Sequence, residues 1–344
     1  MSTAPTQSIP SPQEIQSAKR QLGKSDLFIT PIGFGAWAIG GGSWEFAWGS
    51  QDDSESIAAI RRSVSLGVNW IDTAAVYGLG HSEEMVREAL KDIPKAERPY
   101  VFTKCTLIWD EVRQISHNMQ ADSIRRECES SLKRLGVDSI DLYQMHWPAR
   151  NGNPDGSSPG SIEEALGAMT DLKKQGKIRH IGVSNFTVQH LERAVKVTEI
   201  TSLQPPYSML RPAAEEQLLP WCQSHNVGVI VYSPMLSGLL TGKMTKERVN
   251  SFPDDDWRRN NPEFKEPKLS KNLELVEKLR EIGSRHGRSP GEVAIAWTLR
   301  NPAVTGAIVG GRSEKQVEGI IGAATFLLSP QELSEIDKAL AKLA

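Results

Sequence analysis

The sequence predicts an α/β protein folded as a (β/α)8 TIM barrel, with an N-terminal β-hairpin and extra C-terminal helices. Three observations lead to this prediction. Apolar segments of strand length alternate with amphipathic segments of helix length along most of the 344 residues. The alternation supplies eight strands and about eight intervening helices, and no linker divides it. Polar residues also follow several of the strands, which is where such barrels carry their active sites.

The first part of the chain combines a tail and a hairpin. Residues 1–17 are rich in Ser, Pro and Gln and lack apolar periodicity, so we expect a flexible tail. From Arg20 the sequence RQLGKSDLFITPIGFG is typical of a short hairpin that turns at residues 23–26 and leads into a first strand at 32–36. We expect residues 18–344 to form a single barrel domain.

The remaining elements follow in the order that a barrel requires. The other strands are expected at residues 68–72, 100–104, 140–146, 178–184, 202–204, 227–233 and 304–309. The helices are expected at residues 54–66, 82–90, 122–135, 162–174, 187–197, 215–225, 272–286, 290–300 and 314–324, with a last one from Ser329. A long polar segment at residues 241–271 interrupts the alternation. This pattern fits a closed barrel better than an open sheet.

A glycine-rich motif offers a competing interpretation. Gly33 to Ala38 matches G-x-G-x-x-A after a strand, with acidic residues about 20 positions later, as in a Rossmann fold. In that fold the glycines open a helix. Here the chain continues as IGGGSW, which a helix does not tolerate. We therefore interpret the segment as a loop over the mouth of a barrel.

Composition excludes several classes of function. The formal net charge is −2 and no basic block is present, which argues against a nucleic-acid partner. No apolar run approaches the ~18 residues of a membrane span, and the first residues do not resemble a signal peptide. The three cysteines, Cys105, Cys128 and Cys222, lack metal-like spacing and are expected to be reduced, with no metal site. We expect a cytoplasmic protein.

The ionisable and polar residues that end the strands are the candidate functional residues. They are Asp72, Lys104, His146, Ser184, Asn185, Gln204, Tyr232 and Ser233, with Tyr77 in the loop after Asp72. Each alone has an ordinary structural explanation, such as a turn cap, a surface lysine or a hydrogen-bonded core histidine. Because the carboxyl ends of barrel strands converge on one rim, the whole set predicts an active site.

Seven motifs strengthen this prediction: GAWAIGG, TAAVYGLGHSE, FTKC, DLYQMHWP, GVSNF, YSPM-x-x-GLLTGK and GGRSEKQ. On these motifs the chain resembles the aldo-keto reductase family from Arg20 to Ala324. The resemblance implies a catalytic tetrad of Asp72, Tyr77, Lys104 and His146 that works with NADPH bound across the barrel mouth.

The implied roles fit the chemistry of carbonyl reduction. Hydride addition leaves negative charge on oxygen, which a proton donor must neutralise, and Tyr77 is the implied donor. A free phenol has a pKa near about 10. Lys104 is expected to lower that pKa, Asp72 to keep Lys104 charged, and His146 to orient the carbonyl by a hydrogen bond.

The resemblance also implies the cofactor contacts. Ser184, Asn185 and Gln204 would bind the carboxamide, and Tyr232 would stack on the nicotinamide. Arg312 would pair with the 2′-phosphate, and Gln316 would contact the adenosine side. The remaining implied contacts are Gly35, Ala36, Trp37, Asp72, Ser233, Pro234, Met235, Leu236, Gly238, Lys243, Gly310 and Gly311. Without the resemblance, residues 312–313 would be a simple helix cap.

Two positions depart from the family pattern. Gly319 and Ile320 stand where the family commonly has Glu-Asn to hold the adenine, and Thr106 stands where many members have Gly. The predicted pocket wall is rich in indoles, which suits flat or apolar carbonyl compounds. The wall residues are Trp37, Trp44, Trp48, Trp109 and Trp147; the expected substrate contacts are Trp37, Tyr77, Trp109, His146 and Trp147.

The leading hypothesis is an NADPH-dependent oxidoreductase that reduces aldehydes or ketones. A second hypothesis is a cofactor-binding regulatory subunit similar to the potassium-channel β subunits, although no long partner-binding terminus is evident. A third is an aldolase that forms a Schiff base through Lys104. That lysine must be neutral to attack, whereas Asp72 would keep it charged.

Overall fold

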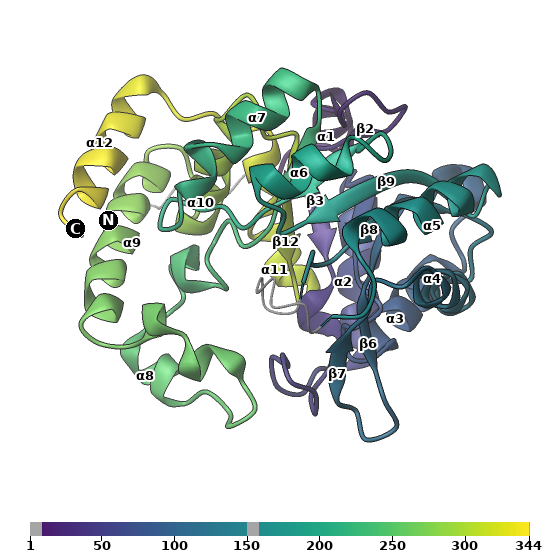
Figure 1. Cartoon of the computed structure of the whole chain (residues 1–344). Helices are drawn as coiled ribbons and strands as arrows, with labels where there is room; N and C mark the ends of the chain where they lie inside the picture. Colours follow the sequence, from purple (N-terminus) through teal and green to yellow (C-terminus); the bar gives the residue numbers. More distant parts are fainter. Residues whose placement is uncertain (1–8, 150–157, 344) are drawn as a thin grey trace.

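A closed barrel of eight parallel strands forms the centre of the computed structural model, which describes residues 9–149 and 158–343. The strands lie around the barrel in sequence order, and the last pairs with the first (Figure 1). They are β3 (Ile32–Gly35), β4 (Trp70–Asp72), β5 (Tyr100–Cys105), β8 (Ile140–Met145), β9 (Ile178–Ser184), β10 (Ser202–Gln204), β11 (Gly228–Val231) and β12 (Gly306–Gly310). The predicted fold class is confirmed.

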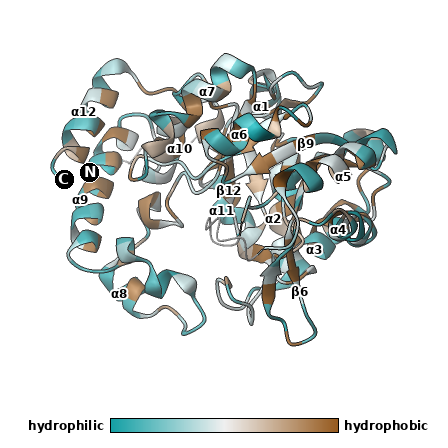
Figure 2. Cartoon of the chain, in the orientation of Figure 1, coloured by the Kyte–Doolittle hydropathy of each residue, from teal (hydrophilic) through white to brown (hydrophobic). Residues whose placement is uncertain are grey.

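Helices surround the strands, and Figure 2 shows that most of them mix hydrophilic and hydrophobic residues, as expected for helices that bury one face. They are α2 (Asp53–Ser65), α3 (His81–Leu90), α4 (Ala121–Leu135), α5 (Ile162–Lys174), α6 (Val188–Ala194), α7 (Leu218–His225), α9 (Lys268–Ser284), α10 (Pro290–Leu299), α11 (Glu314–Glu318) and α12 (Pro330–Leu340). Helix α10 is buried along its whole length. Accordingly, its sequence PGEVAIAWTL has no polar stripe.

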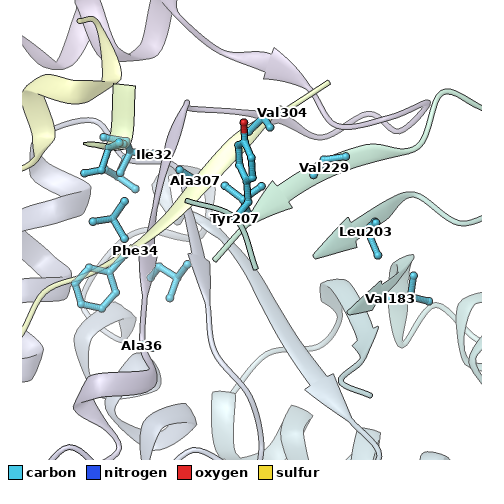
Figure 3. Packing of buried hydrophobic residues seen from close by; sticks show 14 of the residues in the cluster. Ile32, Phe34, Ala36, Val183, Leu203, Tyr207, Val229, Val304 and Ala307 are labelled. Atoms are coloured by element: carbon cyan, nitrogen blue, oxygen red, sulfur yellow. The ribbon is translucent and has the colours of Figure 1, made fainter. Parts of the chain in front are cut away.

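Two clusters of the hydrophobic core belong to the barrel itself, one outside the strands and one inside. Figure 3 shows the outer part, where side chains such as Ile32, Leu203 and Val229 are buried in one hydrophobic cluster. The inner part fills the amino-terminal end of the barrel around Trp70. Here Gly33 is required, because a Cβ on it would lie 2.2 Å from the Trp70 ring.

The N-terminal hairpin is confirmed and covers the amino-terminal end of the barrel. Strands β1 (Arg20–Gln21) and β2 (Phe28–Ile29) pair antiparallel. The segment before them corrects a prediction: Pro12–Ser17 form helix α1 within the expected tail. A capping box starts this helix and Ile15 is fully buried, so the segment is anchored to the barrel. Residues 1–8 of the expected tail lie outside the described part of the chain.

Two insertions rise from the carboxyl ends of the strands, and neither was predicted as structured. Strands β6 (Leu107–Trp109) and β7 (Ile115–His117) form an antiparallel hairpin directly after β5. Helix α8 (Lys246–Asn250) and short 3₁₀ turns lie within the polar segment 241–271. Figure 1 shows both insertions projecting from the same side of the barrel. They therefore form walls around the rim that carries the candidate residues.

The helix predicted at residues 314–324 differs from the structure. Residues 314–324 form α11 and a separate 3₁₀ turn, because the chain leaves the helix at Gly319. Within the described ranges, no helix is both long and apolar enough to cross a membrane.

Candidate active site

Four predicted residues meet at the carboxyl-terminal rim of the barrel. Asp72 ends β4, Lys104 lies in β5, and His146 directly follows β8. Lys104 Nζ lies 2.5 Å from Asp72 Oδ2 and donates to the Tyr77 hydroxyl at 3.3 Å. The rings of Tyr77 and His146 are 5.7 Å apart, edge to face. The structure therefore brings the phenol, the ammonium and the imidazole to one point.

The Asp72 carboxylate is held from two further sides. Gln144 and Gln204 each donate an amide hydrogen to its Oδ1, at 3.0 and 2.8 Å. Lys104 also donates to the Thr73 carbonyl at 2.9 Å. Every member of this network is buried. Because each charge has a partner and further hydrogen bonds, the ion pair can be kept in a buried site.

Gln144 is a site residue that was not predicted from the sequence. It alternates with apolar residues in the β8 segment IDLYQM, and its inward direction follows from strand periodicity. A polar residue facing the inside of a barrel was the available signal.

Burial dominates the protonation of the site. It raises the pKa of Tyr77 well above its ordinary value of 10, and the Asp72 carboxylate adds to this rise. We expected Lys104 to lower the pKa of Tyr77; the net shift is nevertheless upward, because burial is its largest cause. Burial lowers the pKa of Lys104, and pairing with Asp72 opposes that shift. The phenol thus keeps its proton at neutral pH and is available as a donor.

His146 is uncharged at neutral pH. Burial lowers its pKa well below 6.5, and the positive charge of Lys104 lowers it further. A neutral imidazole still offers one N–H donor. His146 can therefore hold a carbonyl oxygen by a hydrogen bond without competing with Tyr77 as an acid.

A cavity of about 720 Å³ opens in front of these residues and extends across the barrel mouth. Most predicted cofactor and substrate residues line it. They are Gly35, Ala36, Trp37, Asp72, Tyr77, His146, Trp147, Ser184, Asn185, Gln204, Tyr232, Ser233, Pro234, Met235, Gly238, Lys243, Gly310, Arg312 and Gln316. Gly319 and Ile320 also line it. Leu236 and Gly311 do not, and both are buried beside it.

The predicted carboxamide site is preorganised. Ser184 Oγ donates to the Gln204 carbonyl at 2.8 Å, and the Tyr232 hydroxyl donates to Asn185 Oδ1 at 2.8 Å. Asn185 Nδ2 donates to the His146 carbonyl at 2.9 Å. Asn185 has a φ of +61°, which asparagine tolerates better than most residues. These bonds couple the polar ends of β9, β10 and β11 to the residue that would orient a carbonyl.

The opposite end of the cavity is basic. Lys243, Arg248, Arg258 and Arg312 all line it. The Arg312 guanidinium donates to Gln51 Oε1 at 2.5 Å and to the carbonyls of Trp48 and Ser50. Arg312 therefore anchors the glycine-rich loop as well as lining the cavity.

Arg258 belongs to the residues that sequence reasoning missed. It pairs with Asp256 and lies over the Trp48 ring, with Cζ 4.7 Å from the ring centroid. Trp257 stacks on Trp37 with ring centroids 5.4 Å apart. Both belong to the long polar segment, where the sequence DDDWRRN has no periodic pattern of apolar residues. A tryptophan amid charges was the only signal.

The indole-rich wall is present with one exception. Trp37, Trp44, Trp48 and Trp147 line the cavity. Trp109 does not line it, and its contact with the substrate stays a prediction. Its ring lies against the Arg134 guanidinium, 5.7 Å from the ring centroid to Cζ. The hairpin turns this indole toward helix α4, where the cation holds it.

The residues present fit a nicotinamide dinucleotide. Amides and a phenol line the cavity near Tyr77, and basic side chains line it as well. The loop after β11 is sharply curved, because Ser233, Leu236 and Ser237 have positive φ. This curvature would let a ligand approach the backbone closely. Such a site can hold a planar amide-bearing ring and an anionic tail at once.

Comparison with known proteins agrees with this geometry. The family model "Aldo/keto reductase family" matches residues 31–341, and the chain belongs to this family. It is 37% identical to the aldo-keto reductase YhdN of Bacillus subtilis over 89% of this chain and 88% of that protein. It is 34% identical to the NADH-specific methylglyoxal reductase of Escherichia coli over 90% of this chain and 94% of that protein.

Solved structures show the same similarity. The glycerol dehydrogenase AKR11B4 from Gluconobacter oxydans superposes with a TM-score of 0.82 and 34% identity, covering 95% of this chain and 96% of that one. The holo form of the aldo-keto reductase AKR11C1 from Bacillus halodurans gives a TM-score of 0.75 and 27% identity, with coverages of 93% and 95%. The protein is therefore an oxidoreductase of this family.

Proposed function

We propose that this protein reduces aldehyde or ketone carbonyls with NADPH and that Tyr77 is the proton donor. The observation that carries this proposal is the contact between the Tyr77 hydroxyl and Lys104, which pairs with Asp72 at the end of the cavity. This arrangement places a protonated phenol beside a buried cation. It does so where polar groups from four strands converge.

The residues act on the oxygen of the substrate. A bound nicotinamide cofactor supplies the hydride for the carbonyl carbon. His146 orients the carbonyl oxygen by donating a hydrogen bond. Tyr77 gives its proton to that oxygen as negative charge develops, and the adjacent Lys104 stabilises the phenolate left behind. Hydride and proton together convert the carbonyl to an alcohol.

Contacts of Lys104 argue against Schiff-base chemistry. Its Nζ contacts Asp72, the Thr73 carbonyl and the Tyr77 hydroxyl. A nucleophilic amine needs a free lone pair, whereas these contacts suit an ammonium. These contacts therefore disfavour an aldolase.

The preference for NADPH rests on the basic end of the cavity. Lys243, Arg248 and Arg312 line it, and a 2′-phosphate would meet positive charge there. A relative in Escherichia coli is named as NADH-specific, so the preference must be tested in this chain. Competing acidic groups, Glu45 and Glu55, also line the cavity.

The apolar walls favour a carbonyl carried on a flat apolar body. The indole N–H groups of Trp37 and Trp44 are already bonded to the carbonyls of Phe46 and Gly41, each at 3.1 Å. These indoles thus present ring surface rather than donors. Hydroxyl groups of a sugar-like substrate would lose water there without gaining partners.

Replacement of Tyr77 by Phe tests the proposal. The phenylalanine keeps the ring but cannot donate a proton, so we expect turnover to fall about 10²- to 10⁴-fold. The dissociation constant for NADPH should stay within about twofold. Cofactor oxidation with an aromatic aldehyde and fluorescence titration of NADPH measure the two quantities. Unchanged turnover would remove Tyr77 as the acid, and a wild type that binds NADPH but reduces no carbonyl would overturn the proposed function.

A further inference from the structure

Thr106 has a strained backbone directly behind the active site. It follows Lys104 and Cys105 at the end of β5, is fully buried, and has a φ of +81°. A β-branched residue rarely adopts this left-handed conformation, because its side chain crowds the backbone. The surrounding structure must therefore hold it in place.

A buried carboxylate from helix α4 provides that hold. Glu127 Oε2 accepts the Thr106 backbone N–H at 2.8 Å. Its Oε1 accepts the Ser123 hydroxyl at 2.9 Å. Glu127 is 9% exposed, so its carboxyl group is buried and bonds both the Thr106 amide and the Ser123 hydroxyl.

Thr106 in turn connects three segments on the side of the cavity where the carbonyl substrate would bind. Its Oγ1 lies 3.4 Å from both the backbone nitrogen and the carbonyl oxygen of Trp147. Its own carbonyl accepts the Asn118 N–H at 3.0 Å. His117 Nε2 lies 2.9 Å from the same Trp147 carbonyl. The end of β5, the return of the β6–β7 hairpin and the residue after His146 thus meet at Thr106.

The parts that meet at Thr106 face the substrate rather than the cofactor. Leu107 and Ile115 from the hairpin, and Trp147, line the cavity near Tyr77. The predicted cofactor contacts come mainly from β9 to β12 on the other side of the barrel. A change at Thr106 should therefore reach the carbonyl substrate first.

We propose that Glu127 is a positioning residue for the part of the cavity that binds the carbonyl substrate. It holds Thr106 in the left-handed conformation, and through Thr106 it sets Leu107, Ile115 and Trp147 against the body of the carbonyl substrate. It does not touch substrate or cofactor. This inference rests on the proposed carbonyl reduction and concerns how that substrate is seated.

Replacement of Glu127 tests the inference. Glu127→Met fills the space without accepting the Thr106 N–H, and we expect the KM for naphthaldehyde to rise about tenfold, equivalent to ~1.4 kcal/mol. The KM for propanal, which is too small to reach the hairpin, should change less than about threefold, and the NADPH dissociation constant less than about twofold. Glu127→Gln keeps an accepting oxygen and should restore the KM for naphthaldehyde to within about threefold of wild type.

Glu332→Met is the matched control. Glu332 is also a buried carboxylate, 5% exposed, and accepts the Ser329 N–H at 2.9 Å at the start of α12. It lies outside the cavity lining, so its loss should lower the melting temperature without changing either KM. A merely structural role of Glu127 would give the same result.

Two changes at Thr106 complete the test. Glycine adopts positive φ without strain, so Glu127→Met should lose most of its effect on KM in a Thr106→Gly background. Thr106→Val keeps the strain but removes the hydroxyl near Trp147, and it should raise the KM for naphthaldehyde even if Glu127→Met does not fold.

The inference is overturned if Glu127→Met leaves KM unchanged, lowers kcat equally with both aldehydes, or acts equally in the Thr106→Gly background. An unchanged KM for naphthaldehyde in Thr106→Val overturns it as well. A wild type that reduces neither aldehyde is a failure of the proposed function instead.

Discussion

Asp72 and Lys104 show how much a buried residue depends on its partner. The pair is almost completely buried, and Gln144 and Gln204 satisfy the remaining carboxylate oxygen. Removing one member leaves a charge without compensation in a site that excludes water. That loss costs more than the pair contributes when it is intact.

Replacing Lys104 by Met should therefore lower the free energy of unfolding by about 3–5 kcal/mol and abolish turnover. The double variant with Asp72→Asn also removes the buried charge, so most of the stability should return while turnover stays absent. Urea denaturation and cofactor oxidation measure the two effects. A double variant as unstable as Lys104→Met would contradict this account of the ion pair.

Glu127 gives the stability a dependence on pH. Burial raises its pKa from 4.5 to about 7. The folded protein thus holds this proton more tightly than the unfolded chain, and the stabilisation is fully present below pH 4.5 and is lost as the pH rises through 7. The shift corresponds to on the order of 3 kcal/mol.

The free energy of unfolding of the wild type should therefore fall relative to Glu127→Gln between about pH 5 and 8. Denaturation at intervals of pH, with the variant subtracted, isolates this group from the histidines. A difference that is constant with pH would show that Glu127 does not titrate in this range.

At the scale of elements, the turn between β12 and α11 has two tasks. Arg312 lines the basic end of the cavity, and it also holds the carbonyls of Trp48 and Ser50 in the glycine-rich loop. Burial lowers the pKa of its guanidinium, and the nearby Arg258 adds to this. An anion at this point would relieve the repulsion between the two cations.

We expect Arg312→Ala to raise the dissociation constant for NADPH at least about tenfold and that for NADH less than about threefold, since only NADPH carries the 2′-phosphate. Fluorescence titration with both cofactors measures the ratio. Gln51→Ala, which removes one contact to the Arg312 guanidinium without removing its charge, serves as the control for loosening of the loop. Equal weakening of both cofactors by Arg312→Ala would mean that this arginine does not read the phosphate.

Elements of regular length were predictable, and the insertions were not. Helix α4 combines an apolar stripe with Gly136 at its C-cap, where φ is +63°, and its predicted bounds differ by one residue. Strands β6 and β7 have three residues each and depend on packing against the barrel rim. Their local sequence carries too few residues for a periodicity to emerge.

On the scale of the whole molecule, an apolar cluster at the amino-terminal end of the barrel lies opposite the candidate site. Leu22 and Leu27 of the N-terminal hairpin pack against Trp70 and Phe102 inside the amino-terminal end. The candidate site occupies the carboxyl-terminal rim. Shortening a side chain of this apolar cluster should therefore lower stability without changing turnover.

Leu27→Ala should lower the free energy of unfolding by about 2–5 kcal/mol, because the Leu27 side chain is fully buried and its removal leaves a cavity. The kcat and the KM of the folded fraction should remain within about twofold of wild type. Thermal unfolding and steady-state kinetics well below the melting temperature test both parts. A large loss of kcat at full folding would show that the two ends are coupled.

The sequence by itself determined the barrel, the order of its elements and the four residues at its rim, since strand and helix periods and strand-end polarity are local properties of the chain. Only the tertiary structure decided that Gln144 supports Asp72, that the Trp109 ring lies against the Arg134 guanidinium, and that burial raises the pKa of Tyr77. These facts depend on closure of the barrel, which excludes water and brings together side chains that are far apart in the sequence.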